Sequence, residues 1–139
     1  MTYVNTIPAA APAVMAFFIG SSNQTVGQNN LVQWAKSGGS SLITVSSGTI
    51  TLPAGYVWAI TTQILLAQDQ VREFVLWDGS AQYTGSQSLN IEQDETGSRI
   101  AFNVLSTEAA SKTIAWRNTQ VSYTINALDT GMQIVGVPK

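Results

Sequence analysis

Apolar and polar residues alternate along most of this chain with a period of two, which is typical of β-strands. Ile50 and Leu52 alternate with threonines in the first clear run. Pro53 then cannot donate to a sheet ladder, and Gly55 permits a sharp reversal before a second alternating run opens at Tyr56. This stretch predicts two strands and the corner between them.

The strand predicted from Tyr56 to Ala67 has one face of large side chains and one face of small ones. The large face carries Tyr56, Trp58, Ile60, Ile64 and Leu66, and the small face carries Ala59, Thr61, Gln63 and Ala67. The next run, Gln70 to Trp77, is apolar on both faces. That pattern is expected of a strand inside a sandwich or beside another subunit.

Shorter alternating runs complete the chain, and turn residues separate them. They are Ile100, Phe102 and Val104; Ile114 and Trp116; Val121, Tyr123 and Ile125; and Met132 and Ile134. About eight short strands with Gly, Asn and Asp at their corners are typical of a β-sandwich or jelly roll. The domain proper shows no apolar period of 3.6, so the predicted fold class is all-β.

The domain boundary is predicted near residue 30. Two polar, turn-rich stretches, Ser21–Asn30 and Ser37–Ser41, flank the short segment Leu31–Trp34. We therefore expect an extended N-terminal arm over residues 1–29 and one jelly-roll domain over residues 30–139.

The arm contains an apolar run, Ala9–Ile19, which has two interpretations. It spans eleven residues and contains Pro12, so it is too short to cross a bilayer, and it lacks the basic start of a secretory signal. No membrane partner is expected. In the alternative interpretation the run is the first strand of the domain, because Val14, Phe17 and Ile19 would suit either role.

The composition of the chain limits the kinds of molecule that it can bind. A chain of 139 residues forms one domain that buries about two thirds of its unfolded surface. Charged residues make up 10% of the chain, where about a quarter is typical, and the formal net charge is -2. The six Lys and Arg residues are scattered, so there is no basic field to bind nucleic acid.

The chain contains neither cysteine nor histidine. Disulfides, thiolate zinc sites, Ser-His-Asp triads and imidazole metal sites are therefore excluded. Asp69, Glu73 and Asp78 are nominal carboxylate pairs, but their spacing gives no arrangement suited to glycoside hydrolysis. We expect no catalytic residues and no cofactor, so the protein is not an enzyme.

Several groups of residues carry a resemblance to a known family. They are Leu31-Val32-Gln33-Trp34, Gly48-Thr49-Ile50-Thr51-Leu52-Pro53-Ala54-Gly55-Tyr56, Phe74-Val75-Leu76-Trp77-Asp78-Gly79, Phe102-Asn103-Val104-Leu105, Ile114-Ala115-Trp116-Arg117 and the closing strand Met132 to Pro138. With these the sequence resembles the C1q and tumour-necrosis-factor-like jelly roll, especially the small versions in tailed-phage virion proteins. The resemblance covers roughly residues 30 to 139.

The resemblance implies a sandwich of about ten strands that commonly assembles as a trimer and has no chemistry of its own. In phages such domains look like head decoration proteins, head fibres or tail-fibre tips. No collagen-like or coiled-coil shaft precedes the domain, and a tail of about thirty residues suits an arm that lies on another protein. Both observations favour decoration of the head.

We therefore expect a cement protein on the outer capsid surface of the virion, which bridges major capsid subunits. Phe17, Phe18 and Ile19 are the expected hydrophobic anchors of the arm on the major capsid protein. Assembly would make the weak contacts multivalent. A secreted bacterial C1q-like adhesion domain is disfavoured, because it would normally begin with a signal peptide.

Subunit contacts are expected on the second faces of three strands. Leu65, Leu105, and Val135 with Val137 would leave apolar surface partly wet in a monomer. We expect these four residues to form a symmetric interface, with a cyclic homotrimer favoured over a dimer.

Two ligand sites are weighed as alternatives. A receptor-binding tip of a head or tail fibre would hold a host glycan with the loop from Gln82 to Gln93, using Tyr83 and Trp77 as aromatic contacts. Asp94 and Glu95, with Glu92 nearby, form an acidic turn that could hold calcium. Their spacing matches no calcium loop, so a solvated turn is favoured and no metal site is expected.

Overall fold

The computed structural model describes residues 12–67, 71–92 and 96–139, and these residues are almost entirely strand and turn. The strands in chain order are β1 (Val14–Gly20), β2 (Gln24–Val26), β3 (Trp34–Gly39), β4 (Thr44–Ser46), β5 (Thr49–Leu52), β6 (Tyr56–Ala67), β7 (Arg72–Trp77), β8 (Leu89–Ile91), β9 (Thr96–Ser106), β10 (Lys112–Asn118), β11 (Tyr123–Ile125) and β12 (Thr130–Pro138). One 3₁₀ turn, η1 (Ala127–Asp129), precedes β12. Within the described ranges no helix is long and apolar enough to cross a membrane.

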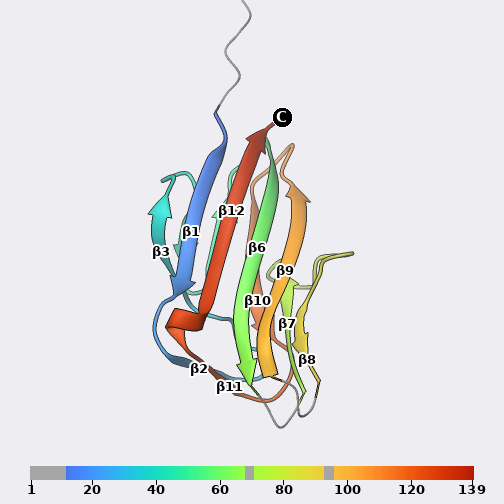
Figure 1. The fold of residues 1–139 in the computed structure, drawn as a ribbon. Helices are drawn as coiled ribbons and strands as arrows, with labels where there is room; N and C mark the ends of the chain where they lie inside the picture. Colours follow the sequence, from blue (N-terminus) through green and yellow to red (C-terminus); the bar gives the residue numbers. More distant parts are fainter. Residues whose placement is uncertain (1–11, 68–70, 93–95) are drawn as a thin grey trace, which may run out of the picture.

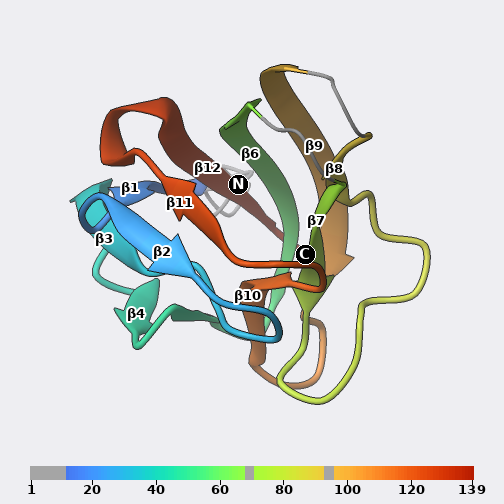
Figure 2. The same cartoon turned by 90° about the horizontal axis from the view of Figure 1, so that it is seen from below.

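Two five-stranded antiparallel sheets pack face to face as a jelly-roll β-sandwich. The first has the order β3-β1-β12-β6-β9, which Figure 1 shows from its outer side, and the second has the order β4-β5-β10-β7-β8. A small β11-β2 sheet lies across the lower end of the sandwich, in front in Figure 2. The predicted all-β fold class is confirmed.

The predicted corner between two strands is also confirmed. β5 ends at Leu52 and β6 begins at Tyr56, and Gly55 between them has a φ of 94°, a value that side-chain-bearing residues rarely adopt. Thr107 fixes this corner from the far end of β9, because its hydroxyl donates to the Pro53 carbonyl at 2.6 Å. The strands alternate from there as the sequence predicts.

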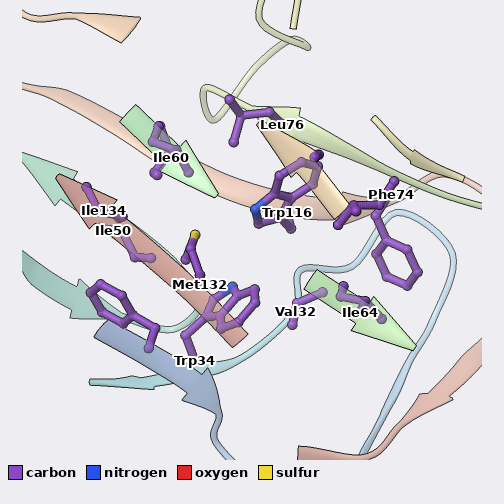
Figure 3. Packing of buried hydrophobic residues seen from close by; sticks show 14 of the residues in the cluster. Val32, Trp34, Ile50, Ile60, Ile64, Phe74, Leu76, Trp116, Met132 and Ile134 are labelled. Carbon is purple, nitrogen blue, oxygen red and sulfur yellow. The ribbon is translucent and has the colours of Figure 1, made fainter. Parts of the chain in front are cut away.

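Two tryptophans dominate the interior. Trp58 and Trp116 are fully buried, and each satisfies its indole N–H inside the sandwich. The Trp58 Nε1 donates to the Thr107 hydroxyl at 2.9 Å, and the Trp116 Nε1 donates to the Thr62 hydroxyl at 2.9 Å. Because Trp116 lies in one sheet and Thr62 in the other, the second bond crosses the core. Figure 3 shows Trp116 among the buried hydrophobic side chains.

The size of Trp58 dictates its neighbour on β12. Gly136 is paired with Trp58 in the antiparallel register, and a Cβ at position 136 would overlap the indole ring. Glycine is therefore required here by close packing and not by backbone conformation.

Side chains close both open sides of the sandwich. On one side the Lys36 ammonium donates to the Ile43 carbonyl at 3.0 Å. On the other, Gln87 binds the outer edge of β9: its side-chain oxygen accepts from the Phe102 N–H at 2.8 Å, and its own N–H donates to the Asn103 side chain at 2.6 Å. The edge of β9 is thus capped by a loop, which discourages pairing with another strand there.

The expected arm over residues 1–29 is wrong for its second half. β1 lies inside the first sheet, paired with β12 on one side and with β3 on the other. β2 also belongs to the domain, because it pairs with β11. Residues 1–11 lie outside the described residues, so the domain boundary falls before residue 14 and not near residue 30.

The physical reason lies in the alternation of β1. Val14, Ala16 and Phe18 are buried against the core, while Met15 and Phe17 face outward. The alternative interpretation of this run as a core strand is therefore correct. Phe18 is 2% exposed and cannot act as an anchor on another protein.

Replacing Gly136 with alanine should destabilise the fold. The added methyl group must displace Trp58, and overpacking of this kind costs about 1–3 kcal/mol in the free energy of unfolding. Urea unfolding followed by tryptophan fluorescence measures this cost. Gly38→Ala is the matched control, since a Cβ there meets nothing within 4 Å. Equal stabilities of the two variants would contradict the packing argument.

Truncation separates the arm from the strand. Removing residues 1–20 deletes β1 from between its two partners and should abolish the native β-sheet signal. Removing residues 1–11 takes away none of the described strand pairings and should preserve it. Circular dichroism with thermal melting checks both proteins. If the protein that lacks residues 1–20 melts cooperatively at the temperature of the full-length chain, the placement of β1 is refuted.

Candidate functional site

The outer side of the first sheet is apolar over four adjacent strands. We call the outward side chains of β1, β12, β6 and β9 the apolar face; Figure 1 shows these four strands side by side. Its exposed large hydrophobic residues are Met15, Phe17, Ile19, Leu65, Ile100, Phe102, Val104 and Val137. Exposed apolar side chains gathered on one face normally mark a contact with another molecule.

The exposed residues form two stripes at opposite sides of the apolar face. The β1 stripe consists of Met15, Phe17 and Ile19, which are 39%, 40% and 48% exposed. The β9 stripe consists of Ile100, Phe102 and Val104, which are 61%, 54% and 62% exposed. β12 and β6 lie between the stripes.

The apolar face is uncharged. Within the described residues, the outward positions of its four strands carry no Lys, Arg, Asp or Glu. The middle strands instead place small or neutral polar groups outward, among them Ala59, Thr61, Gln63 and Gln133. Depletion of charge is the compositional sign of the centre of an interface between proteins.

Three of the four predicted interface residues lie together on this face. Leu65, Val135 and Val137 all point outward from β6 and β12. Leu105 does not, because it packs against the hydrophobic core from the inner side of β9. The alternation of side chains on β9 was predicted, but the bulkier side chains, Ile100, Phe102 and Val104, prove to point outward.

The predicted anchors divide between two environments. Phe18 belongs to the core, whereas Phe17 and Ile19 lie on the apolar face. No separate hydrophobic arm is therefore formed by these three residues. The residues that sequence reasoning missed are Met15, Ile100, Phe102 and Val104. Alternation of hydrophobic residues predicts a strand there, but it does not tell which face of the strand points to the core and which to the surface.

A second candidate site lies beside the outer edge of β9. A pocket of about 500 Å³ lies between this strand and the loop after β7. Its lining combines the loop residues Tyr83 to Gln87 with Asn103 and the side chains around it. The loop groups are hydroxyls and amides without charge, which suit neutral polar ligands.

The two predicted glycan contacts lie on different sides of the second sheet. Tyr83 lines the pocket, but its hydroxyl donates to the Thr113 carbonyl at 2.6 Å, and its ring packs against the core. Trp77 faces outward, and the Arg117 guanidinium stacks on its ring at 4.1 Å from the centroid. They do not form one aromatic platform.

The ionisable group Asp78 near the pocket stabilises the turn that follows β7. The Asp78 carboxylate accepts from the Ala81 and Ser80 N–H groups, both at 2.7 Å, and these bonds lower its pKa. Burial raises the pKa of Tyr83, and the negative charge of Asp78 raises it further. Both shifts follow from local structure and identify no acid–base pair.

The acidic turn considered for calcium lies partly outside the described residues. Asp94 and Glu95 lie outside the described residues, as does Asp69 from the nominal carboxylate pairs. Within residues 12–67, 71–92 and 96–139, no three His, Cys, Asp or Glu side chains gather into a group that could hold a metal ion.

Comparison with known proteins identifies the fold. No family model and no curated protein matches the sequence. A structure of Eiger TNF from S. frugiperda matches with a TM-score of 0.71 and 16% identity, over 93% of this chain and 95% of that one. Murine APRIL, crystallised at pH 5.0, matches with a TM-score of 0.72 and 9% identity, over 91% of this chain and 100% of that one.

The globular domain of zebrafish complement 1qA matches with a TM-score of 0.56 and 11% identity, over 91% of this chain and 96% of that one. These likenesses extend over almost the whole of both chains. The protein therefore has a C1q/TNF-like jelly-roll fold.

Proposed function

We propose that the protein is a non-enzymatic virion component of a tailed phage, which self-associates as a homotrimer and decorates the outer capsid surface. The observation that carries the proposal is the apolar face, which is uncharged along its strands and spans four strands. A monomer would leave this surface in water, whereas assembly would bury it.

The virion setting is supported by the resemblance to small phage jelly rolls. As a cement protein it would hold neighbouring capsid subunits together. Each subunit of the oligomer would make one weak contact with the capsid, and the contacts would add because the subunits are joined. Because β1 belongs to the sandwich, the contact with the major capsid protein cannot use Phe17, Phe18 and Ile19 as a free arm. Residues 1–11 or the exposed loops of the domain are the segments available for it.

A receptor-binding tip is the second candidate function, and the loop pocket favours it. The pocket of about 500 Å³ falls within the size range of small-ligand sites, and its hydroxyl and amide lining suits a neutral sugar. A glycan array separates the two candidate functions. Binding of a glycan by the wild type that is lost in a Gln87→Ala variant would support the receptor-binding tip.

Self-association should depend on the β9 stripe. Phe102→Asp places a charge in the middle of the β9 stripe, and burying it without a partner is unfavourable, so the variant should sediment as a monomer of 14.8 kDa. Val121→Asp changes an exposed apolar residue outside the face and should keep the trimer. Trimers of both variants in analytical ultracentrifugation would rule out the apolar face as the contact.

The place of the protein on the particle decides its role. A cryo-electron-microscopy map of the native virion should show sandwich-shaped density repeated over the capsid lattice. Density confined to the tail or to fibre tips would overturn decoration in favour of receptor binding.

A further inference from the structure

We propose that the protein binds an acidic saccharide, whose sugar residues carry a carboxylate, in a pocket beside the second sheet, with Arg117 as the partner of the carboxylate. The proposal goes beyond self-association and does not rest on it. It follows from the unused hydrogen-bonding groups of the pocket, from the fixed position of Arg117 and from the place of the pocket away from the apolar face.

The pocket has a volume of about 380 Å³ and lies between β2, the turn that follows it and the tip of the β4–β5 hairpin. We call it the amide pocket. None of its lining residues is charged, and only Val26 and Leu31 are apolar. Amides and hydroxyls offer donors and acceptors without charge, which suits a ligand rich in hydroxyl groups. An apolar peptide would bury little surface there.

Three side chains of the lining have unused hydrogen-bonding capacity. The amides of Asn29 and Asn30 and the hydroxyl of Ser47 are exposed, and within the described ranges they form no hydrogen bond. Gln24 in the same lining is already engaged, because its side chain binds both the N–H of Gln33, at 2.7 Å, and the Gln33 carbonyl, at 2.9 Å. The first three groups are therefore the ones available to a ligand.

A buried asparagine holds the turn that carries two of these groups. Asn118 is fully buried, and its backbone accepts from the Asn29 N–H at 2.6 Å and donates to the Asn30 carbonyl at 2.9 Å. Its side chain donates to the Val26 carbonyl at 2.9 Å. Since the turn is fixed before any ligand arrives, little ordering of the chain opposes binding.

Two lining residues have a left-handed backbone. Asn29 has a φ of 66° and Ser47 a φ of 48°, and they are the two non-glycine residues of the described ranges with a positive φ. Ser47 precedes Gly48 at the hairpin tip, where a Cβ would come within 2.6 Å of the Val32 carbonyl. The tip therefore packs directly on the segment that carries Leu31, and both walls of the pocket are set by the fold.

Arg117 brings a positive charge to the edge of the pocket. Leu31, in the pocket lining, and Arg117 are antiparallel bridge partners, so their side chains lie next to each other on the same face. The Arg117 Nε donates to the Asn29 carbonyl at 3.4 Å, and the guanidinium stacks on the Trp77 ring. These contacts fix the side chain beside the pocket.

Arg117 has no acidic partner within the described part of the chain. Glu73 lies on the same face of β7 as Trp77, but it accepts from the Thr119 hydroxyl at 2.7 Å and forms no ion pair with Arg117. An arginine whose flat side rests on an aromatic ring keeps its N–H edge free for a carboxylate, which it binds through two parallel hydrogen bonds. A sugar that carries a carboxylate would thus use both the neutral pocket and the charge beside it.

The amide pocket lies apart from the surface proposed for self-association. None of its lining residues belongs to β1, β12, β6 or β9. The loop pocket, in contrast, shares Phe102 and Val104 with the β9 stripe, so contacts through that stripe would cover it. An oligomer would keep the amide pocket of every copy open, and a polymeric saccharide could occupy several of them at once.

Nuclear magnetic resonance titration of the full-length, isotopically labelled protein tests the proposal. The probes are short oligomers of glucuronic acid and of galacturonic acid, and oligomers of glucose and of galactose are their neutral counterparts. At least one acidic oligomer should shift the side-chain amide signals of Asn29 and Asn30. It should also bind about tenfold more tightly than its neutral counterpart, because only the acid engages Arg117.

A matched pair of variants tests the role of the charge. Arg117→Gln should lower the affinity for the acidic oligomer to that of the neutral one. Lys112→Gln removes the same charge from an exposed position on the same strand, outside the pocket, and should bind like the wild type. An Arg117→Gln variant that keeps the preference for the acid would overturn the proposal.

A second pair of variants tests the pocket itself. Asn29→Gly and Ser47→Gly suit the left-handed backbone, so both should fold like the wild type, and both should weaken binding of the acidic oligomer. If Arg117→Gln fails to fold, these two variants decide the proposal. Unchanged binding by both would overturn it.

The titration and the sedimentation experiments fail separately. If no acidic oligomer shifts the Asn29 and Asn30 signals, or if the shifts appear instead at Tyr83 to Gln87 in the loop pocket, this proposal is overturned whatever the oligomeric state. A wild type that sediments as a monomer but binds the acidic oligomer as described would overturn only the proposed self-association.

Discussion

The interior of the sandwich is packed around two fully buried indole rings. Trp58 and Trp116 occupy the space between the sheets, and their N–H groups are satisfied by the hydroxyls of Thr107 and Thr62. On the β12 side of Trp58 there is no room for a side chain. Gly136 lies against the Trp58 ring, and Ala101 pairs with Thr62. Without disulfides the chain depends on this packing.

The alternation of side chains on β9 has a consequence on the outer surface. Since side chains alternate along a strand, small inward residues on β9 leave the larger set pointing outward. Ala101 and Asn103 face the core, so Ile100, Phe102 and Val104 face solvent. A strand that could have contributed its bulk to the interior instead contributes it to a surface.

Sequence reasoning predicted β5 to β7, β9 to β12, the corner at Gly55 and the fold class, because these depend on local alternation and turn chemistry. It failed where long-range contacts decide. Leu105 and Phe102 lie on opposite faces of β9, and both faces carry hydrophobic residues. Only the packing between the two sheets determines which face is buried. β2 pairs with β11, about a hundred residues away, so a polar stretch that reads as a linker becomes part of the domain.

β1 connects folding to assembly. Its inward residues Ala16 and Phe18 complete the core, and its outward residues Met15, Phe17 and Ile19 form one side of the apolar face. A change in this strand therefore acts on both the free energy of unfolding and the affinity between copies. Because assembly favours the folded chain by mass action, the measured stability should rise with protein concentration if copies associate through this face. The strand that looked like an appendage is then the element through which the two equilibria are coupled.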